Sequence, residues 1–167
     1  MARLSTIIVT TSAFCASLTF SAETALSQGT KEDLVGTWTV VSNENTQPDG
    51  KKVLPFGSNA QGILTFDAAG RYAIQICSAE RPKFASNNRL QGTPEEYKSA
   101  VHGCNPHWGR YTVADGSIVF KIEHATFPNW EGIEQKRPFS IKGDELTYKV
   151  PAASSGGTSE LVWKRAR

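Results

Sequence analysis

Four polar side chains in the C-terminal half of the chain have the types and the spacing to hold or act on a small molecule. His124, Gln135, Arg137 and Tyr148 each fall in phase with apolar residues of a segment that alternates like a β-strand. An arginine can form a two-pronged contact with a carboxylate or an enolate. A histidine can donate a hydrogen bond or move a proton near neutral pH. The pattern predicts either a ligand pocket or an acid–base site.

The apolar residues in phase with these four predict a largely apolar lumen. Successive side chains of a strand point to opposite faces, so every second residue faces the same side. Apolar walls with a few polar groups are typical of a ligand pocket. Trp130, in the loop 127–132, is expected either to stack on a ligand or to cover the end of the fold as core. The candidate lumen residues are Arg137, His124, Tyr148, Gln135, Tyr72, Phe120 and Trp130.

The charged and titratable candidates also have structural interpretations. Arg137 can instead pair with a core carboxylate or pack over a tryptophan, because buried charges are usually paired. His124 can be a hydrogen-bonded core residue. A one-residue bulge at Pro138 would turn Arg137 outward. The burial of Arg137 therefore decides whether it belongs to a site.

Turn signals divide the chain after residue 33 into eight predicted strands. Asp115 and Gly116 form the strongest short hairpin signal. In the longest connection, Thr93 as N-cap, Pro94 at the first helical position and Glu96 closing a capping box predict one helix over about 94–102. The predicted strands cover 34–42, 61–67, 71–77, 108–114, 117–126, 133–141, 145–150 and 160–165.

These elements predict the fold class. An antiparallel series of hairpin-linked strands leaves two edges, and closing the sheet into a barrel removes them. We therefore expect an all-β, eight-stranded antiparallel up-and-down barrel with one short helix in a long connection. Eight strands enclose room for one small ligand. The net charge of +2 excludes a strongly basic nucleic-acid surface.

The N-terminus has the pattern of an export signal. Residues 1–27 are predicted to be a signal peptide and residues 28–167 the barrel domain. Arg3 precedes an uncharged stretch, and the small residues Ala25 and Ser27 directly precede the expected cleavage site before Gln28. The stretch is too short and too polar for a membrane span. The mature protein is therefore expected in the periplasm or secreted; a retained anchor helix is the alternative.

The cysteines support the same compartment. Removal of the signal takes Cys15 and leaves Cys77 and Cys104, a candidate disulfide in an oxidising compartment. Two unpaired buried thiols are the alternative. His102 and His107 bracket Cys104, but a third well-spaced ligand is missing, so no metal is expected. No motif indicates a cofactor.

The first strand carries a family resemblance. Gly36-Thr37-Trp38 resembles the Gly-x-Trp signature of lipocalins and their relatives. In those proteins the Trp plugs the closed end of the barrel and a basic side chain from the last strand packs over it, which implies these roles for Trp38 and Arg165. Much of the mature chain resembles the lipocalin-like domain proteins of bacteria and fungi, a resemblance that implies the fold and no single activity. The matching stretches are LVGTW (34–38), DAAGR (67–71), RPKFA (81–85), TPEEY (93–97), GRY (109–111), FPNW (127–130) and LVW (161–163).

Three functions fit these observations. The first is binding of a small hydrophobic or amphipathic molecule in the lumen by a monomer or small homo-oligomer, with no nucleic acid involved. The second is an isomerase, cyclase or hydratase, in which His124 acts as acid and base while Arg137 and Tyr148 stabilise an oxyanion. The third is a structural or interaction barrel of the cell envelope, marked by an exposed apolar patch outside the mouth. The apolar lumen favours the first.

Overall fold

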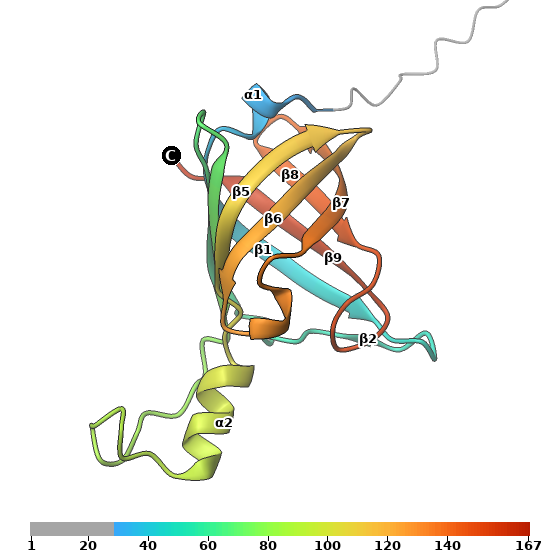
Figure 1. Ribbon diagram of the computed structural model, residues 1–167. Coiled ribbons are helices and arrows are strands. Elements are labelled where there is room, and N and C mark those ends of the chain that lie inside the picture. The colour runs from blue at the N-terminus through green and yellow to red at the C-terminus, as the bar shows by residue number, and fades with distance from the viewer. Residues whose placement is uncertain (1–28) are drawn as a thin grey trace, which may run out of the picture.

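The computed structural model describes residues 29–167, and the predicted signal peptide lies outside the described residues (Figure 1). Residues 29–167 form two short helices, one 3-10 turn and nine strands. Their bounds, in chain order, are α1 (Lys31–Leu34), β1 (Gly36–Thr46), β2 (Lys52–Val53), β3 (Gln61–Phe66), β4 (Arg71–Cys77), α2 (Pro94–His102), β5 (His107–Ala114), β6 (Ser117–Ala125), η1 (Pro128–Trp130), β7 (Glu134–Lys142), β8 (Glu145–Val150) and β9 (Thr158–Arg165).

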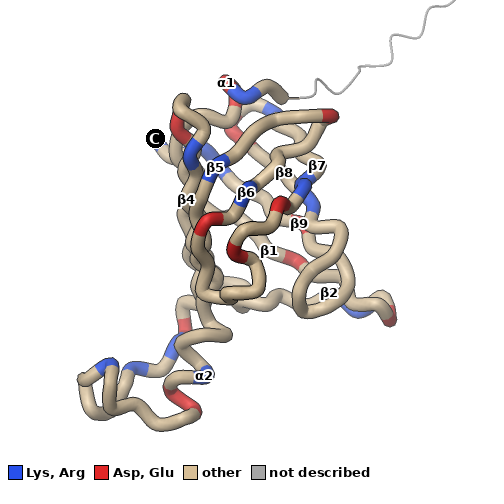
Figure 2. Tube along the Cα trace, in the orientation of Figure 1, with Lys and Arg blue, Asp and Glu red and all other residues tan. Residues whose placement is uncertain are grey.

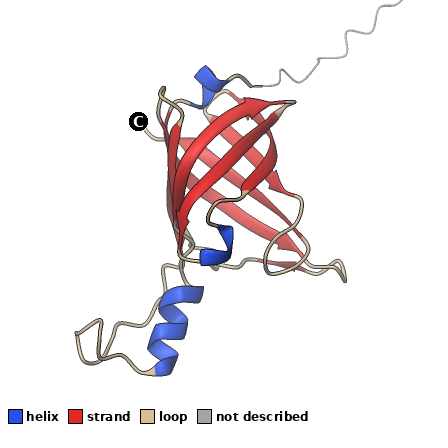
Figure 3. Cartoon of the chain, viewed as in Figure 1, coloured by secondary structure: helices blue, strands red, loops and turns tan. Residues whose placement is uncertain are grey.

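Eight of the strands close into an antiparallel barrel, which confirms the predicted fold class (Figure 3). Each strand pairs with its neighbour in the chain, and β1 then pairs with β9 from Trp38↔Arg165 to Thr46↔Thr158. This last pairing removes both open edges of the sheet. The additional strand, β2, was not predicted, because a segment of two residues is too short to show an alternation. It extends the sheet beyond the far end of β1.

The hairpins form where the turn residues permit them. Asp115 and Gly116 both adopt positive φ, at 50° and 67°. Two such residues give the turn whose twist matches that of the flanking strands β5 and β6. At the β3–β4 turn, the Asp67 carboxylate accepts a hydrogen bond from the Arg71 backbone N–H at 2.7 Å. Local turn chemistry therefore fixes the register of these two hairpins.

One end of the barrel is closed by Trp38. Its side chain is fully buried and its indole N–H donates to the Leu34 carbonyl at 2.8 Å. The guanidinium of Arg165 lies 4.1 Å from the ring centroid of Trp38 and donates to the carbonyls of Val35 at 2.9 Å and Asp33 at 2.7 Å. Arg165 thus ties β9 to the end of α1 across the plug.

The glycine of the Gly-x-Trp motif is required by this arrangement. Gly36 has a φ of +130°, which side chains rarely adopt, and a Cβ there would lie 3.1 Å from the Arg165 guanidinium. A larger residue would strain the backbone and crowd the cation. The motif therefore allows the chain to turn into β1 directly beneath Arg165.

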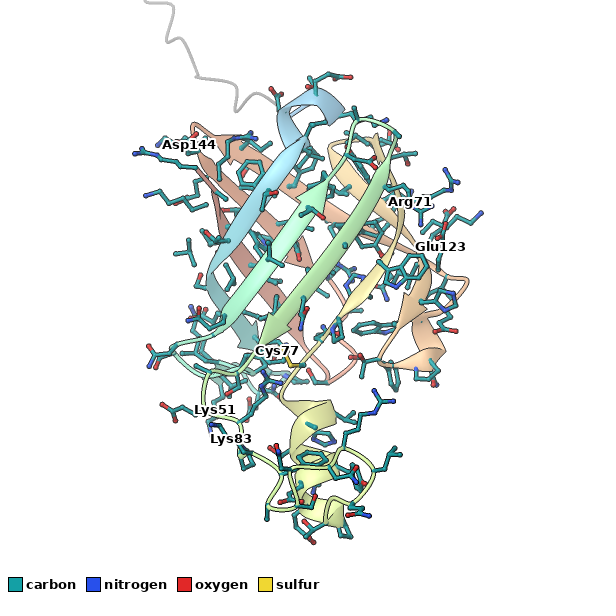
Figure 4. All side chains as sticks on the ribbon, turned by 90° about the vertical axis from the view of Figure 1, so that its left-hand side faces the viewer. Lys51, Arg71, Cys77, Lys83, Glu123 and Asp144 are labelled. Atoms are coloured by element: carbon teal, nitrogen blue, oxygen red, sulfur yellow. A yellow bond between two sulfur atoms is a disulfide. The ribbon has the colours of Figure 1, made fainter. Side chains whose placement is uncertain are left out.

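The opposite end of the barrel carries a protruding arm, residues 78–103, which includes α2 (Figure 1). The capping box of Thr93 and Glu96 is present, and α2 spans Pro94–His102 as predicted. At the base of the arm, Cys77 and Cys104 form the predicted disulfide (Figure 4). Closing a loop of this length contributes about 3–4 kcal/mol in the chain-entropy model.

We expect Arg165→Met to lower the free energy of unfolding by about 2 kcal/mol, because two hydrogen bonds from a cation and its contact with Trp38 are lost. Urea denaturation followed by tryptophan fluorescence measures the change. Lys164→Met is the matched control, since Lys164 is exposed on the same strand. Equal stability of the two variants would contradict the role of Arg165.

Candidate ligand-binding site in the barrel

A cavity of about 490 Å³ occupies the half of the barrel away from Trp38. The barrel strands supply its walls. The loop around η1, the C-terminal turn of α2 and the β8–β9 loop supply its rim. Its apolar and aromatic lining includes Phe56, Ile74, Ile76, Val101, Phe120, Phe127, Trp130, Tyr148, Val150 and Leu161. Its polar lining includes Asn43, His102, Asn105, His107, Gln135, Arg137 and Ser159.

Arg137 lines this cavity without an acidic partner. β7 pairs regularly with β6 through Ile118↔Arg137 and Ser117↔Pro138, so the bulge considered at Pro138 is absent. The guanidinium donates to the side-chain oxygen of Gln135 and to the Lys136 carbonyl. Within residues 29–167, no carboxylate lies within ion-pair distance of Arg137. Burial lowers the pKa of Arg137, yet an arginine remains charged.

Tyr148 gives the cavity a neutral donor beside that cation. Its side chain is buried on β8, where the neighbouring position of β7 is Phe139, two residues from Arg137. Burial raises the pKa of Tyr148, and the nearby Arg137 only partly opposes this. The phenol therefore keeps its proton at neutral pH. Together the two side chains can donate hydrogen bonds to a carboxylate, enolate or carbonyl oxygen.

His107 is a lumen residue that sequence reasoning missed. The residue is 8% exposed, and its Nδ1 lies 2.9 Å from the hydroxyl of Tyr72. Burial, with a smaller contribution from Arg137, lowers the pKa of His107 to about 3. The imidazole is therefore neutral in the folded protein at physiological pH. Its position two residues before Gly109 and four before the buried Tyr111 was the available signal, because alternate residues of β5 face inward.

His124 does not lie in the lumen, so this prediction was wrong. The β5–β6 register shifts between Trp108↔His124 and Gly109↔Ile122, which leaves Glu123 as an extra residue. Such a bulge reverses the inside–outside alternation beyond it. His124 is consequently exposed, with Nδ1 3.4 Å from a Glu131 carboxylate oxygen and its ring tilted by 45° against that of Trp108 at a centroid distance of 4.8 Å.

The bulge also builds a charged cluster on the outer surface. Glu123 pairs with Arg71 at 2.9 Å and with Arg110 at 3.5 Å, and Figure 4 shows Arg71 and Glu123 pointing toward each other outside the barrel. Figure 2 shows charges of both signs spread over the strands and the arm. The charged side chains of this cluster therefore lie on the outer surface and not in the apolar lumen.

The remaining predicted lumen residues take different places. Phe120, Gln135 and Trp130 line the cavity. Trp130 packs edge-on against His107, with ring centroids 5.6 Å apart, so it belongs to the rim and wall together. Tyr72 is buried behind His107 and holds it by the hydrogen bond described above.

Comparison with known proteins defines the family to which this barrel belongs. The lipocalin-like domain model matches residues 35–166, and the chain belongs to this family. The 4'-hydroxy-3'-methoxypropiophenone carrier protein of Aspergillus oryzae is 31% identical over 105 residues, which cover 56% of this chain and 95% of the relative.

Solved structures of two further proteins are similar to this chain. Wild-type fluorescent protein UnaG is 15% identical, with 81% of this chain and 98% of that chain covered at a TM-score of 0.38. Fatty-acid-binding protein 1 of Echinococcus granulosus is 12% identical, with 81% and 99% covered at a TM-score of 0.40.

We expect the free energy of unfolding to fall by roughly 1–2 kcal/mol between pH 6.5 and pH 5 through His107. The unfolded chain protonates this histidine near pH 6.5, whereas the folded protein resists protonation until about pH 3. The unfolded state therefore binds more protons, and stability is lost as the pH falls. Urea denaturation at a series of pH values measures the slope.

His107→Asn should flatten that slope, because asparagine offers Tyr72 a polar partner and does not titrate. His124→Asn is the matched control, since it removes a histidine from the outer surface and not from the lumen. A His107→Asn variant with the wild-type slope would show that other groups cause the acid sensitivity.

Proposed function

We propose that this protein is an exported carrier that binds one small amphipathic molecule in the barrel lumen. The observation that carries the proposal is Arg137, a cation on the wall of an apolar cavity with no carboxylate of residues 29–167 within ion-pair distance. A charge removed from water is costly unless it is paired. A ligand that brings an anionic or strongly polar oxygen to Arg137 supplies the missing partner.

The cavity sets the shape of the occupant. A volume of about 490 Å³ lies within the range of small-molecule sites. Phe120, Trp130 and Leu161 would contact the apolar body of the ligand, while Arg137 and Tyr148 bind its polar oxygen. The carrier activity in the name of the Aspergillus oryzae relative supports this assignment.

The alternative of proton-transfer catalysis loses its main residue. It depended on His124 as the acid and base, and His124 lies on the outer surface. The histidine that does line the cavity, His107, has its pKa lowered to about 3 by burial and is a weak base. Binding without turnover is therefore the function that the geometry supports best.

We expect Arg137→Met to weaken binding of dodecanoate by about 10- to 100-fold, because a hydrogen-bonded charge contributes roughly 1.5–3 kcal/mol. Isothermal titration calorimetry measures the affinity, with 4'-hydroxy-3'-methoxypropiophenone as a second, neutral probe. Lys136→Met removes the same charge from an exposed neighbour and should bind like wild type. Failure of the wild-type protein to bind either probe, or equal binding by both variants, would refute the proposed site.

Export is supported by the N-terminal sequence and by the disulfide between Cys77 and Cys104, since such bonds persist in oxidising compartments. Within residues 29–167, no helix is both long enough and apolar enough to cross a membrane.

Expression of the full chain in a bacterial host tests export. We expect the protein in the periplasm or medium, beginning at Gln28, with an intact mass two hydrogen atoms below that of the reduced form. Mass spectrometry before and after reduction measures both features. Cytoplasmic accumulation of the uncleaved chain would contradict export, and an unchanged mass on reduction would contradict the disulfide.

A further inference from the structure

Asn43 is a buried polar residue on the cavity wall whose amide oxygen has no hydrogen-bond partner within the described chain. Its side chain lies on β1 and is 9% exposed. A buried polar group left unpaired costs free energy comparable to a lost hydrogen bond. An apolar residue would suit this position better if stability alone mattered.

Asn45, two residues along the same strand, is a buried asparagine with a structural role and serves as a comparison for Asn43. It is fully buried, and its amide donates to the Gly156 carbonyl at 3.1 Å and to the Ser159 hydroxyl at 2.9 Å. Its oxygen accepts a hydrogen bond from Gln47. The fold therefore satisfies one asparagine of this face completely and leaves the other without a partner for its oxygen.

The position of Asn43 relative to Arg137 follows from the strand order. Asn43 pairs with Leu161 on β9, Leu161 with Tyr148 on β8, and Tyr148 with Phe139 on β7. Asn43 is thus three strands from the strand of Arg137. In a ring of eight strands the greatest separation is four, so the two side chains line nearly opposite walls of the lumen.

We propose that Asn43 is a specificity-determining residue that binds a hydroxyl group of the ligand. The inference rests on the proposed binding function and names the second polar end of its ligand. A hydroxyl both donates and accepts hydrogen bonds, and so pairs with either half of an amide. The terminal torsion of an asparagine is broad, which lets the amide turn toward the cavity.

The occupant is therefore a molecule with two polar ends. One end carries a carboxylate or carbonyl oxygen for Arg137 and Tyr148. The other carries a hydroxyl for Asn43, and an aromatic or apolar body joins them. Hydroxyaryl acids and hydroxyaryl ketones have this chemistry, whereas plain fatty acids satisfy only the end at Arg137.

The test compares two acids that differ only in the hydroxyl, 3-(4-hydroxyphenyl)propanoate and 3-phenylpropanoate. We expect the wild-type protein to bind the hydroxylated acid about 5- to 10-fold more tightly, as measured by calorimetry. Asn43→Leu should abolish this preference, so that the two acids bind the variant with equal affinity. Asn43→Asp, which keeps a hydrogen-bond acceptor, should retain the preference even if its charge weakens both acids equally.

Stability measurements separate binding from folding. Asn43→Leu should have a urea midpoint no lower than that of wild type, whereas Asn45→Leu should have a lower midpoint because its hydrogen bonds are lost. If Asn43→Leu fails to fold, Asn43→Ser replaces it in the binding measurement. This substitution removes the amide and shortens the side chain, so a folded Asn43→Ser variant should also lose the preference.

A wild-type protein that binds both acids equally, or an Asn43→Leu variant that keeps the preference, would overturn the role of Asn43 and leave the site at Arg137 standing. Binding of neither acid would overturn the two-ended ligand. The response of dodecanoate binding to Arg137→Met would then decide the proposed function separately.

Discussion

The pairing of β1 with β9 is the interaction on which the rest of the molecule depends. It joins the first and last long strands of the barrel and satisfies the backbone groups that an open sheet would leave at its two edges. It also brings Arg165 over Trp38 at one end and Asn43 beside Leu161 toward the other. Without this closure, neither the plug nor the cavity wall would exist.

The two ends of the barrel provide opposite environments for an arginine side chain. At the plugged end, Arg165 donates to two backbone carbonyls, lies over an aromatic face and has the Asp144 carboxylate at 3.9 Å, so its charge is balanced within the fold. In the cavity, Arg137 finds the side-chain oxygen of Gln135 and one carbonyl, and no anion in the described chain. The first arginine contributes to stability, whereas the second reduces it in the absence of a ligand.

Most of the fold was predictable because its signals are local. The alternation in β4 and β8, the capping box at Thr93 and the turn at Asp115 each depend on a few adjacent residues, and the predicted bounds match closely. Barrel closure followed from the number of strands. The disulfide followed from the two cysteines that lie outside the predicted signal peptide.

Two errors at the site, the inward placement of His124 and the omission of Asn43, have one physical cause, the β-bulge. Each bulge reverses the alternation from which inward positions are inferred. The extra residue Glu123 moved His124 outside. A second register shift between Val40 and Ser42 places Asn43 inside, although counting by twos from Trp38 assigns it to the outer face. Gly109 was the one available sign of the first bulge, since glycine within a strand often marks such a site.

The disulfide at the base of the arm makes the barrel wall less dependent on the conformation of the arm, residues 78–103. Because Cys77 and Cys104 hold the end of β4 and the segment entering β5 together, the spacing of these two strands at the mouth is fixed at the base of the arm. The 26 residues of that insertion can therefore change in length, order or composition without altering the register of the wall. The bond thus isolates the strand register from most of the arm, while the C-terminal turn of α2 keeps Val101 and His102 on the rim of the cavity.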